Sequence, residues 1–159
     1  MGEKVCFFTG HRDIRSEDAQ NIIGDLDAAI DSAIRDGVAV FRSGGAVGFD
    51  TLAALCVLKR KQSNQKIKLS LYLPCRDQTR FWGEYDKGVH EYLIANADEV
   101  IYTAEEYSQG CMLYRNRRMV DGASVGIAYC NSATGGTAYT VEHAKKLDIR
   151  VVNIAQKKS

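Results

Sequence analysis

Short apolar runs alternate along this chain with longer segments whose apolar residues recur at helical spacing. The runs have the length of strands and are apolar enough to be buried on both faces. They lie at residues 5–8, 38–41, 67–73, 100–102, 125–129 and 151–154. A regular alternation of strand and helix favours a parallel sheet with helices on both sides. The sequence therefore predicts an α/β, Rossmann-like three-layer sandwich around a mostly parallel sheet of five to six strands.

The segments between the runs carry recognisable helix signals. Ser16 is a suitable N-cap for a helix with Glu17 and Asp18 in its first turn. Gly37 suits the left-handed conformation that ends such a helix. Further helices are predicted at residues 49–61, in the second half of 78–96, and at 112–122 and 138–147.

Length and composition fit one domain over residues 1–159. Hydrophobic residues make up 45% and charged residues 26% of the chain, which is the usual globular mixture. The net charge of +1 argues against a nucleic-acid-binding domain, because such domains are usually strongly basic. No apolar run approaches the roughly 20 residues that a membrane helix needs, so no membrane partner is expected.

The cysteines and histidines give no sign of a metal site. The sequence has 5 cysteines without a Cys-x-x-Cys pair, and only 3 histidines. Scattered cysteines are typical of proteins that stay reduced in the cytoplasm, and zinc would need clustered ligands. We expect a cytoplasmic protein without a metal ion and without a cofactor.

Three loops after predicted strands carry the residues best suited to bind a ligand, since ligands of open α/β sheets bind beyond the carboxyl ends of strands. The loop 43–50 is rich in glycine and precedes a helix, a context in which backbone amides can bind phosphate. The alternative is a tight turn without a ligand. Asp50 could accept from ribose hydroxyls, or simply favour the start of the helix electrostatically.

The other two loops, at residues 9–12 and 134–137, and the helix predicted at 112–122 add polar candidates. Arg12 offers a planar guanidinium to an anion, whereas His11 is either structural or an acid–base group. Asn116 falls within the apolar stripe of helix 112–122 and Arg115 borders it, so each needs a polar partner, which a ligand could be. The aromatic segment 81–85, which holds Trp82, could supply a ring that stacks on a base, or it could pack in the core. The candidate ligand-binding residues are Thr9, Gly10, His11, Arg12, Ser43, Gly44, Gly45, Ala46, Gly48, Asp50, Arg115, Asn116, Gly135, Gly136 and Thr137.

Four motifs, at residues 9–12, 43–50, 115–121 and 135–137, together resemble the SLOG superfamily of Smf/DprA and LOG-like Rossmann domains, and within it the YpsA-like proteins. The resemblance implies a nucleotide-like ligand in the crevice and a homodimer. The LOG-like branch hydrolyses nucleoside 5′-monophosphates, and its catalytic arginine matches Arg115. Thr140 stands where that branch has a catalytic glutamate, and a threonine cannot supply the carboxylate.

The leading hypothesis is a sensor or regulatory domain that binds a nucleotide or nucleotide-sugar derivative at the carboxyl edge of the sheet. The alternative is a LOG-like hydrolase of an N-glycosidic or phosphoanhydride bond, in which Arg115 would be catalytic. A third hypothesis is single-stranded DNA binding, as in the DprA-like branch, but the balanced charge argues against it.

Overall fold

The computed structural model describes residues 2–155, and strands and helices alternate through them. The strands are β1 (Lys4–Gly10), β2 (Val38–Ser43), β3 (Lys68–Leu73), β4 (Glu99–Tyr102), β5 (Val125–Tyr129) and β6 (Arg150–Asn153). The helices are α1 (Ser16–Arg35), α2 (Phe49–Lys61), α3 (Glu84–Asn96), α4 (Cys111–Val120) and α5 (Gly136–Lys146). The predicted α/β architecture is confirmed. Across these residues, no helix is both long and apolar enough to span a lipid bilayer.

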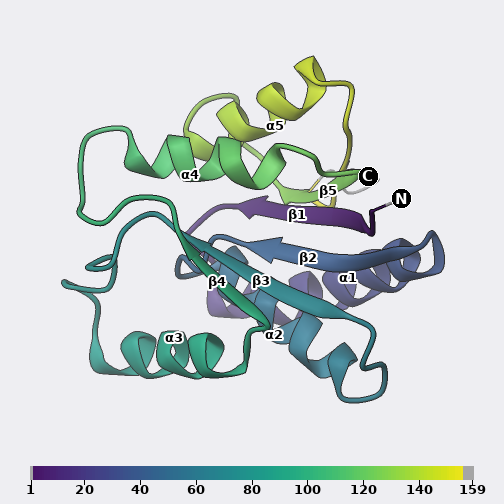
Figure 1. Ribbon diagram of the computed structural model, residues 1–159, viewed down its shortest axis with the longest axis horizontal. Coiled ribbons are helices and arrows are strands. Elements are labelled where there is room, and N and C mark those ends of the chain that lie inside the picture. Colours follow the sequence, from purple (N-terminus) through teal and green to yellow (C-terminus); the bar gives the residue numbers. More distant parts are fainter. Residues whose placement is uncertain (1, 156–159) are drawn as a thin grey trace.

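The strand order places a change of direction in the middle of the sheet. The strands lie in the order β4-β3-β2-β1-β5-β6, and each pair is parallel. The chain moves outward from β1 to β4 and then returns to place β5 on the other side of β1. Helices α1, α2 and α3 cover one face, while α4 and α5 cover the other (Figure 1). The connections after β1 and β5 therefore diverge, and a crevice opens between them.

The core lies on both sides of β1, as expected for a strand in the centre of a parallel sheet. Phe8 packs on the side of α1 and α2, with its ring centroid 5.8 Å from that of Phe41 and 6.3 Å from that of Phe49. Phe7 packs on the opposite side with Met119 of α4. Because these side chains are fully or almost fully buried, they fix the helices against the sheet.

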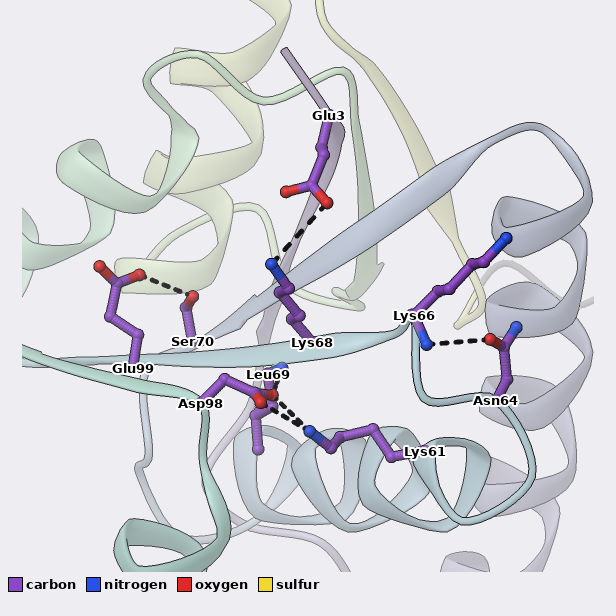
Figure 2. Close-up of polar contacts among 9 residues, drawn as sticks. All are labelled: Glu3, Lys61, Asn64, Lys66, Lys68, Leu69, Ser70, Asp98 and Glu99. Carbon is purple, nitrogen blue, oxygen red and sulfur yellow. Dashed lines mark hydrogen bonds and ion pairs between the residues drawn. The ribbon is translucent and has the colours of Figure 1, made fainter.

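Polar contacts pin the outer strand β4 to its neighbours (Figure 2). The Asp98 carboxylate accepts the backbone N–H of Leu69 at 2.9 Å and the Lys61 ammonium at 2.7 Å. The Ser70 hydroxyl donates to the Glu99 carboxylate at 2.9 Å. These contacts join α2, β3 and the start of β4 at the edge of the sheet.

Several predicted helix boundaries differ from the structure, and two of the differences have a local cause. Ser16 is the first helical residue rather than the N-cap, because the extended residue is Arg15, with φ −71° and ψ 141°. Helix α5 begins at Gly136, earlier than predicted, because Gly135 with φ +100° turns the chain directly into the helix. Gly37 does take the left-handed conformation after α1, with φ +101°.

Replacing Gly126 by alanine should destabilise the sheet. A Cβ at this position of β5 would stand 2.2 Å from Cζ of Phe7, whose ring is fully buried and cannot move freely. We expect Gly126→Ala to lower the free energy of unfolding by about 1–3 kcal/mol, measured by urea denaturation. The matched control is Gly24→Ala in α1, where nothing lies within 4 Å. It should raise the stability by about 0.5–1 kcal/mol. An equal effect of both variants would contradict this packing.

Candidate functional site

A cavity of about 690 Å³ lies at the carboxyl edge of the sheet, where the chain changes direction. Its volume falls within the range of about 300–1,000 Å³ that is typical of small-molecule sites. The predicted residues that line it are Thr9, Gly10, His11, Arg12, Ala46, Asp50, Arg115, Asn116, Gly135, Gly136 and Thr137. The loops after β1 and β5 and the start of α4 therefore do meet around one space.

The loop 43–50 uses its own side chains to satisfy its backbone. The Gly45 N–H donates to the Ser43 hydroxyl at 3.2 Å, and the Ala46 N–H donates to the Asp50 carboxylate at 3.4 Å. Ser43, Gly44 and Gly45 are buried, and neither they nor Gly48 are among the lining residues. Phosphate binding by these glycines stays a prediction, and this arrangement of the loop gives it no support.

The glycines of this loop instead make room for close approaches. A Cβ on Gly44 would stand 2.7 Å from Nη1 of Arg115 and 2.8 Å from Oδ2 of Asp50. Gly48 has φ +85°, and a Cβ there would stand 2.2 Å from the Arg12 carbonyl oxygen. The glycine-rich sequence therefore lets a buried arginine and a buried carboxylate lie against the turn.

Arg115 is held in the wall of the cavity by backbone oxygens. Only 4% of the residue is exposed. Its Nη1 donates to the carbonyl oxygen of Gly44, and to that of Tyr72 at 3.1 Å. Its Nε donates to Oδ1 of Asn116 at 2.8 Å, so Asn116 finds its partner in the protein. Burial lowers the pKa of Arg115, and the charge of Asp50 opposes that shift. The Nη2 nitrogen retains donors for a ligand.

Asp50 brings a carboxyl group into the same wall. It is 7% exposed, and its main-chain oxygen accepts the Ser43 hydroxyl at 3.0 Å. Burial raises the pKa of Asp50 to about 6, although the nearby guanidinium groups of Arg115 and Arg12 favour the ionised form. A buried carboxyl group that titrates near neutral pH and lines a cavity is a candidate for proton transfer as well as for ligand binding.

His11 braces the two loops at the change of direction. Its Nε2 accepts the Asn131 N–H at 3.1 Å, and its carbonyl oxygen accepts the Phe49 N–H at 3.1 Å. Its ring lies edge-on to that of Tyr129, with centroids 5.8 Å apart. These contacts correspond to the structural role of His11. Arg12 is exposed at the cavity rim, and within residues 2–155 its guanidinium forms no ion pair.

The start of α5 presents backbone donors to the cavity. Gly135, Gly136 and Thr137 line it, and among the described residues no acceptor takes the N–H groups of Gly136 and Thr137. The first N–H groups of a helix lack partners within the helix and lie at its positive end. An anionic group in this part of the cavity would therefore meet unpaired donors.

The connection between β3 and α3 supplies a wall that sequence patterns largely fail to indicate. They single out the aromatic segment 81–85 as one that could stack, but neither residues 75–80 nor the loop after β4. The additional lining residues are Cys75, Asp77, Gln78, Arg80, Phe81 and Tyr107, besides Met112 and Met119 of α4 and Thr134. The same rule that singled out the ends of β1, β2 and β5 also applies to β3, and could have found the first five.

No group of three histidine, cysteine, aspartate or glutamate side chains that could hold a metal ion occurs among residues 2–155. The polar residues that line the cavity include arginines, amides, threonines, a histidine and two carboxylates. The model of the YspA SLOG family matches residues 6–155 of the chain. The chain belongs to this family.

This SLOG-family chain is similar in sequence to one bacterial protein and similar in fold to several solved structures. The SPbeta prophage-derived protein YoqJ of Bacillus subtilis strain 168 is 29% identical over 118 residues, covering 67% of this chain and 69% of YoqJ. The DprA structure from Streptococcus pneumoniae is 18% identical, with a TM-score of 0.63, and 94% of this chain matches 49% of it. DprA from Helicobacter pylori is 20% identical, with a TM-score of 0.65, and 94% of this chain matches 64% of it. TM1055 is 14% identical, with a TM-score of 0.59 and coverages of 93% and 72%.

The chain thus spans about half of one of these DprA proteins, at 49%, and 64% of the other. At these levels of identity the structural likeness concerns the fold alone. At Thr140, where the LOG-like branch of the superfamily has a glutamate, the side chain is fully buried and donates to the Gly136 carbonyl oxygen at 2.8 Å. This residue supplies no carboxylate to the cavity.

The raised pKa of Asp50 should make stability depend on pH. The folded protein binds this proton more tightly than the unfolded chain, so stability should fall as the pH rises from about 4 to 6 and level off above. A pKa displaced from 3.8 to about 6 corresponds to about 3 kcal/mol. The amide side chain of the Asp50→Asn variant cannot ionise, so the stability of this variant should not fall over the same pH range.

Urea denaturation of both proteins between pH 4 and pH 8 measures the effect. The stability of Asp50→Asn relative to the native protein should increase by about 2–3 kcal/mol over that interval. A difference that stays constant with pH would contradict the buried, protonatable state of Asp50.

Proposed function

We propose that this chain binds a nucleotide or a nucleotide-sugar derivative in the cavity and serves as a sensor or regulatory domain. The observation that carries the proposal is the composition of the cavity, whose wall combines cationic side chains and N–H donors with aromatic rings. A nucleotide has the same two parts, an anionic phosphate and a flat base, connected by a sugar.

The phosphate would bind between the start of α5 and the rim. The unpaired N–H groups of Gly136 and Thr137 could donate to an anion. Arg12 adds a guanidinium that forms no ion pair among the described residues. The remaining Nη2 donors of Arg115 add positive charge deeper in the wall. Together these groups would neutralise a phosphate without a metal ion.

The sugar would lie against Asp50. Its carboxylate accepts the Ala46 N–H through Oδ2 and lines the cavity, so it can accept ribose hydroxyl groups as well. The aromatic side chains Phe81, Trp82 and Tyr107 lie on other parts of the wall, where a base could stack. We also propose that residues 1–159 act as one nucleotide-binding domain that forms a homodimer.

DprA from Helicobacter pylori, which shares the fold, binds single-stranded DNA. For this chain, a net charge of +1 favours a small nucleotide over a polyanion, because nucleic-acid grooves are built from an excess of basic residues. An oligonucleotide therefore belongs among the ligands tested, and tight, salt-sensitive binding of it would replace the present proposal.

Introducing a carboxylate at the start of α5 should weaken nucleotide binding without damaging the fold. A Cβ on Gly136 would have only Nδ2 of Asn116 nearby, at 4.0 Å. Gly136→Asp should keep or raise helix stability, because acidic residues favour a helix N-terminus, but it should repel phosphate. We expect titration calorimetry with nucleoside 5′-monophosphates to show at least tenfold weaker binding, which is about 1.4 kcal/mol.

The matched control is Gly24→Asp, which adds the same charge to an exposed site on α1 with nothing within 4 Å of the new Cβ. It should bind nucleotides as the native protein does. Failure of the folded native protein to bind any nucleotide, nucleotide-sugar or ADP-ribose derivative would overturn the proposal.

A second function is favoured by Asp50, whose pKa near 6 suits acid–base catalysis beside the fixed Arg115. In hydrolysis of an N-glycosidic bond, the bond from C1′ to the base breaks and a water oxygen bonds to C1′. Asp50 would give its proton to the departing base and regain one from the water. Neither Thr140 nor any other residue of α5 is required in this scheme.

Incubation of the native protein with nucleoside 5′-monophosphates, followed by chromatography, tests this hydrolase function. If the function is present, free base should accumulate, and Asp50→Asn should slow its release by about a hundredfold or more. Nucleotide binding without release of base would leave the sensor function and exclude hydrolysis of the compounds tried.

A further inference from the structure

We propose that the connection between β3 and α3 forms a base-binding subsite that selects a nucleobase with adjacent N–H donors, as in guanine. This inference rests on the proposed nucleotide-binding function and names the base that the cavity accepts. It is carried by two unpaired acceptor atoms and by exposed aromatic rings that line the same wall.

The two acceptors are Oδ1 of Asp77 and Oε1 of Gln78. Both oxygens are buried, and no N–H or O–H group of the described residues donates to either. The thiol of Cys75, a weak donor, interacts with the Asp77 carboxylate: burial and then this carboxylate raise the pKa of Cys75 to about 11. Both residues line the cavity. A buried acceptor without a donor is unfavourable, and native proteins leave few of them. An N–H group of a ligand would satisfy each of these oxygens once its side chain rotates to turn the oxygen toward the cavity.

The acceptors are held in place by the turn that carries them. The Arg80 N–H donates to the Asp77 carbonyl oxygen at 3.1 Å, and the Trp82 N–H donates to that of Thr79 at 2.9 Å. Nη1 of Arg80 lies 3.5 Å from Oδ2 of Asp77, so this ion pair engages Oδ2 and not Oδ1. The main chain that carries both acceptors is therefore fixed by its own turn.

Aromatic rings stand beside these acceptors. Phe81 is 86% exposed and Tyr107 is 63% exposed, although both line the cavity. The Arg80 guanidinium lies 4.7 Å from the centre of the Phe81 ring, and Trp82 is held edge-on against His90 with centroids 5.1 Å apart. Large exposed rings in a cavity wall suit stacking on a planar base, which contributes affinity without regard to base identity.

The loop that carries Tyr107 is tied to the same turn. The Arg76 N–H donates to the Glu105 carbonyl oxygen at 3.2 Å, and Arg76 Nε lies 2.7 Å from the Glu105 carboxylate. The loops after β3 and β4 thereby face the cavity together. The stacking ring and the acceptors belong to one connected wall.

The chemistry of the acceptors decides which base fits. Guanine presents N1–H and the 2-amino group side by side, so a carboxylate oxygen and an amide oxygen can accept from adjacent donors. Adenine places the ring acceptor N1 beside its amino group, and the lone pair of N1 would face the Asp77 carboxylate. Hypoxanthine keeps N1–H but lacks the 2-amino donor. The acceptor pair therefore favours guanine, then hypoxanthine, then adenine.

The test is titration calorimetry of the native protein with guanosine, inosine and adenosine 5′-monophosphates. We expect the guanosine nucleotide to bind at least tenfold more tightly than the adenosine nucleotide, with the inosine nucleotide between them. Asp77→Asn, which keeps the shape and removes the charge, should reduce that preference to less than threefold. Asp86→Asn, an exposed carboxylate in the first turn of α3 that is not among the lining residues, is the matched control and should preserve it.

Tyr107→Ala separates stacking from hydrogen bonding. It should weaken all three nucleotides by a similar factor and leave their order unchanged. Equal affinities for the three nucleotides, or an unchanged preference in folded Asp77→Asn, would overturn the base subsite. If Gly136→Asp still weakened binding at least tenfold in that case, the proposed nucleotide-binding function would stand. Absence of nucleotide binding by the native protein would overturn both.

Discussion

The change of direction between β1 and β5 is the constraint on which the cavity depends. Because α1 to α3 cover one face of the sheet and α4 and α5 cover the other, the loops that follow these two strands leave in opposite directions. The space between them cannot be filled by either layer of helices. His11 bridges the two loops by accepting the Asn131 N–H, so the opening keeps a defined width.

Arg115 turns this opening into a polar site. A buried guanidinium is costly unless its donors are satisfied, and here carbonyl oxygens from the ends of β2 and β3 accept from it. The arginine thus joins α4 to the sheet while placing positive charge beside Asp50. Burial acts on both groups, lowering the pKa of Arg115 and raising that of Asp50 to about 6. A polar ligand would meet groups that are already desolvated and oriented.

The glycine-rich loop 43–50 shows how a motif can serve a different purpose from the one its sequence suggests. Its pattern predicts free amides, but Ser43 and Asp50 accept the N–H groups of Gly45 and Ala46. Gly44 lacks a Cβ where Arg115 and Asp50 approach. The loop therefore positions the charged pair, while the start of α5 retains the unpaired amides. The two glycine turns differ because Ser43 and Asp50 lie close enough to accept the amides of loop 43–50, whereas no acceptor takes the first amides of α5 among the described residues.

The sequence by itself determined the strands, the helices and the edge of the sheet at which a ligand could bind. These follow from local patterns, and the predicted bounds of α2 and β5 agree with the structure. Helix α5 starts earlier than the sequence predicts because Gly135 adopts a positive φ, a conformation that glycine permits but does not require. Only the tertiary structure decided that Arg115 is buried against the ends of β2 and β3, or that Gln78 and Tyr107 line the same wall. Such contacts join residues far apart in the chain, and local periodicity carries no information about which distant groups meet.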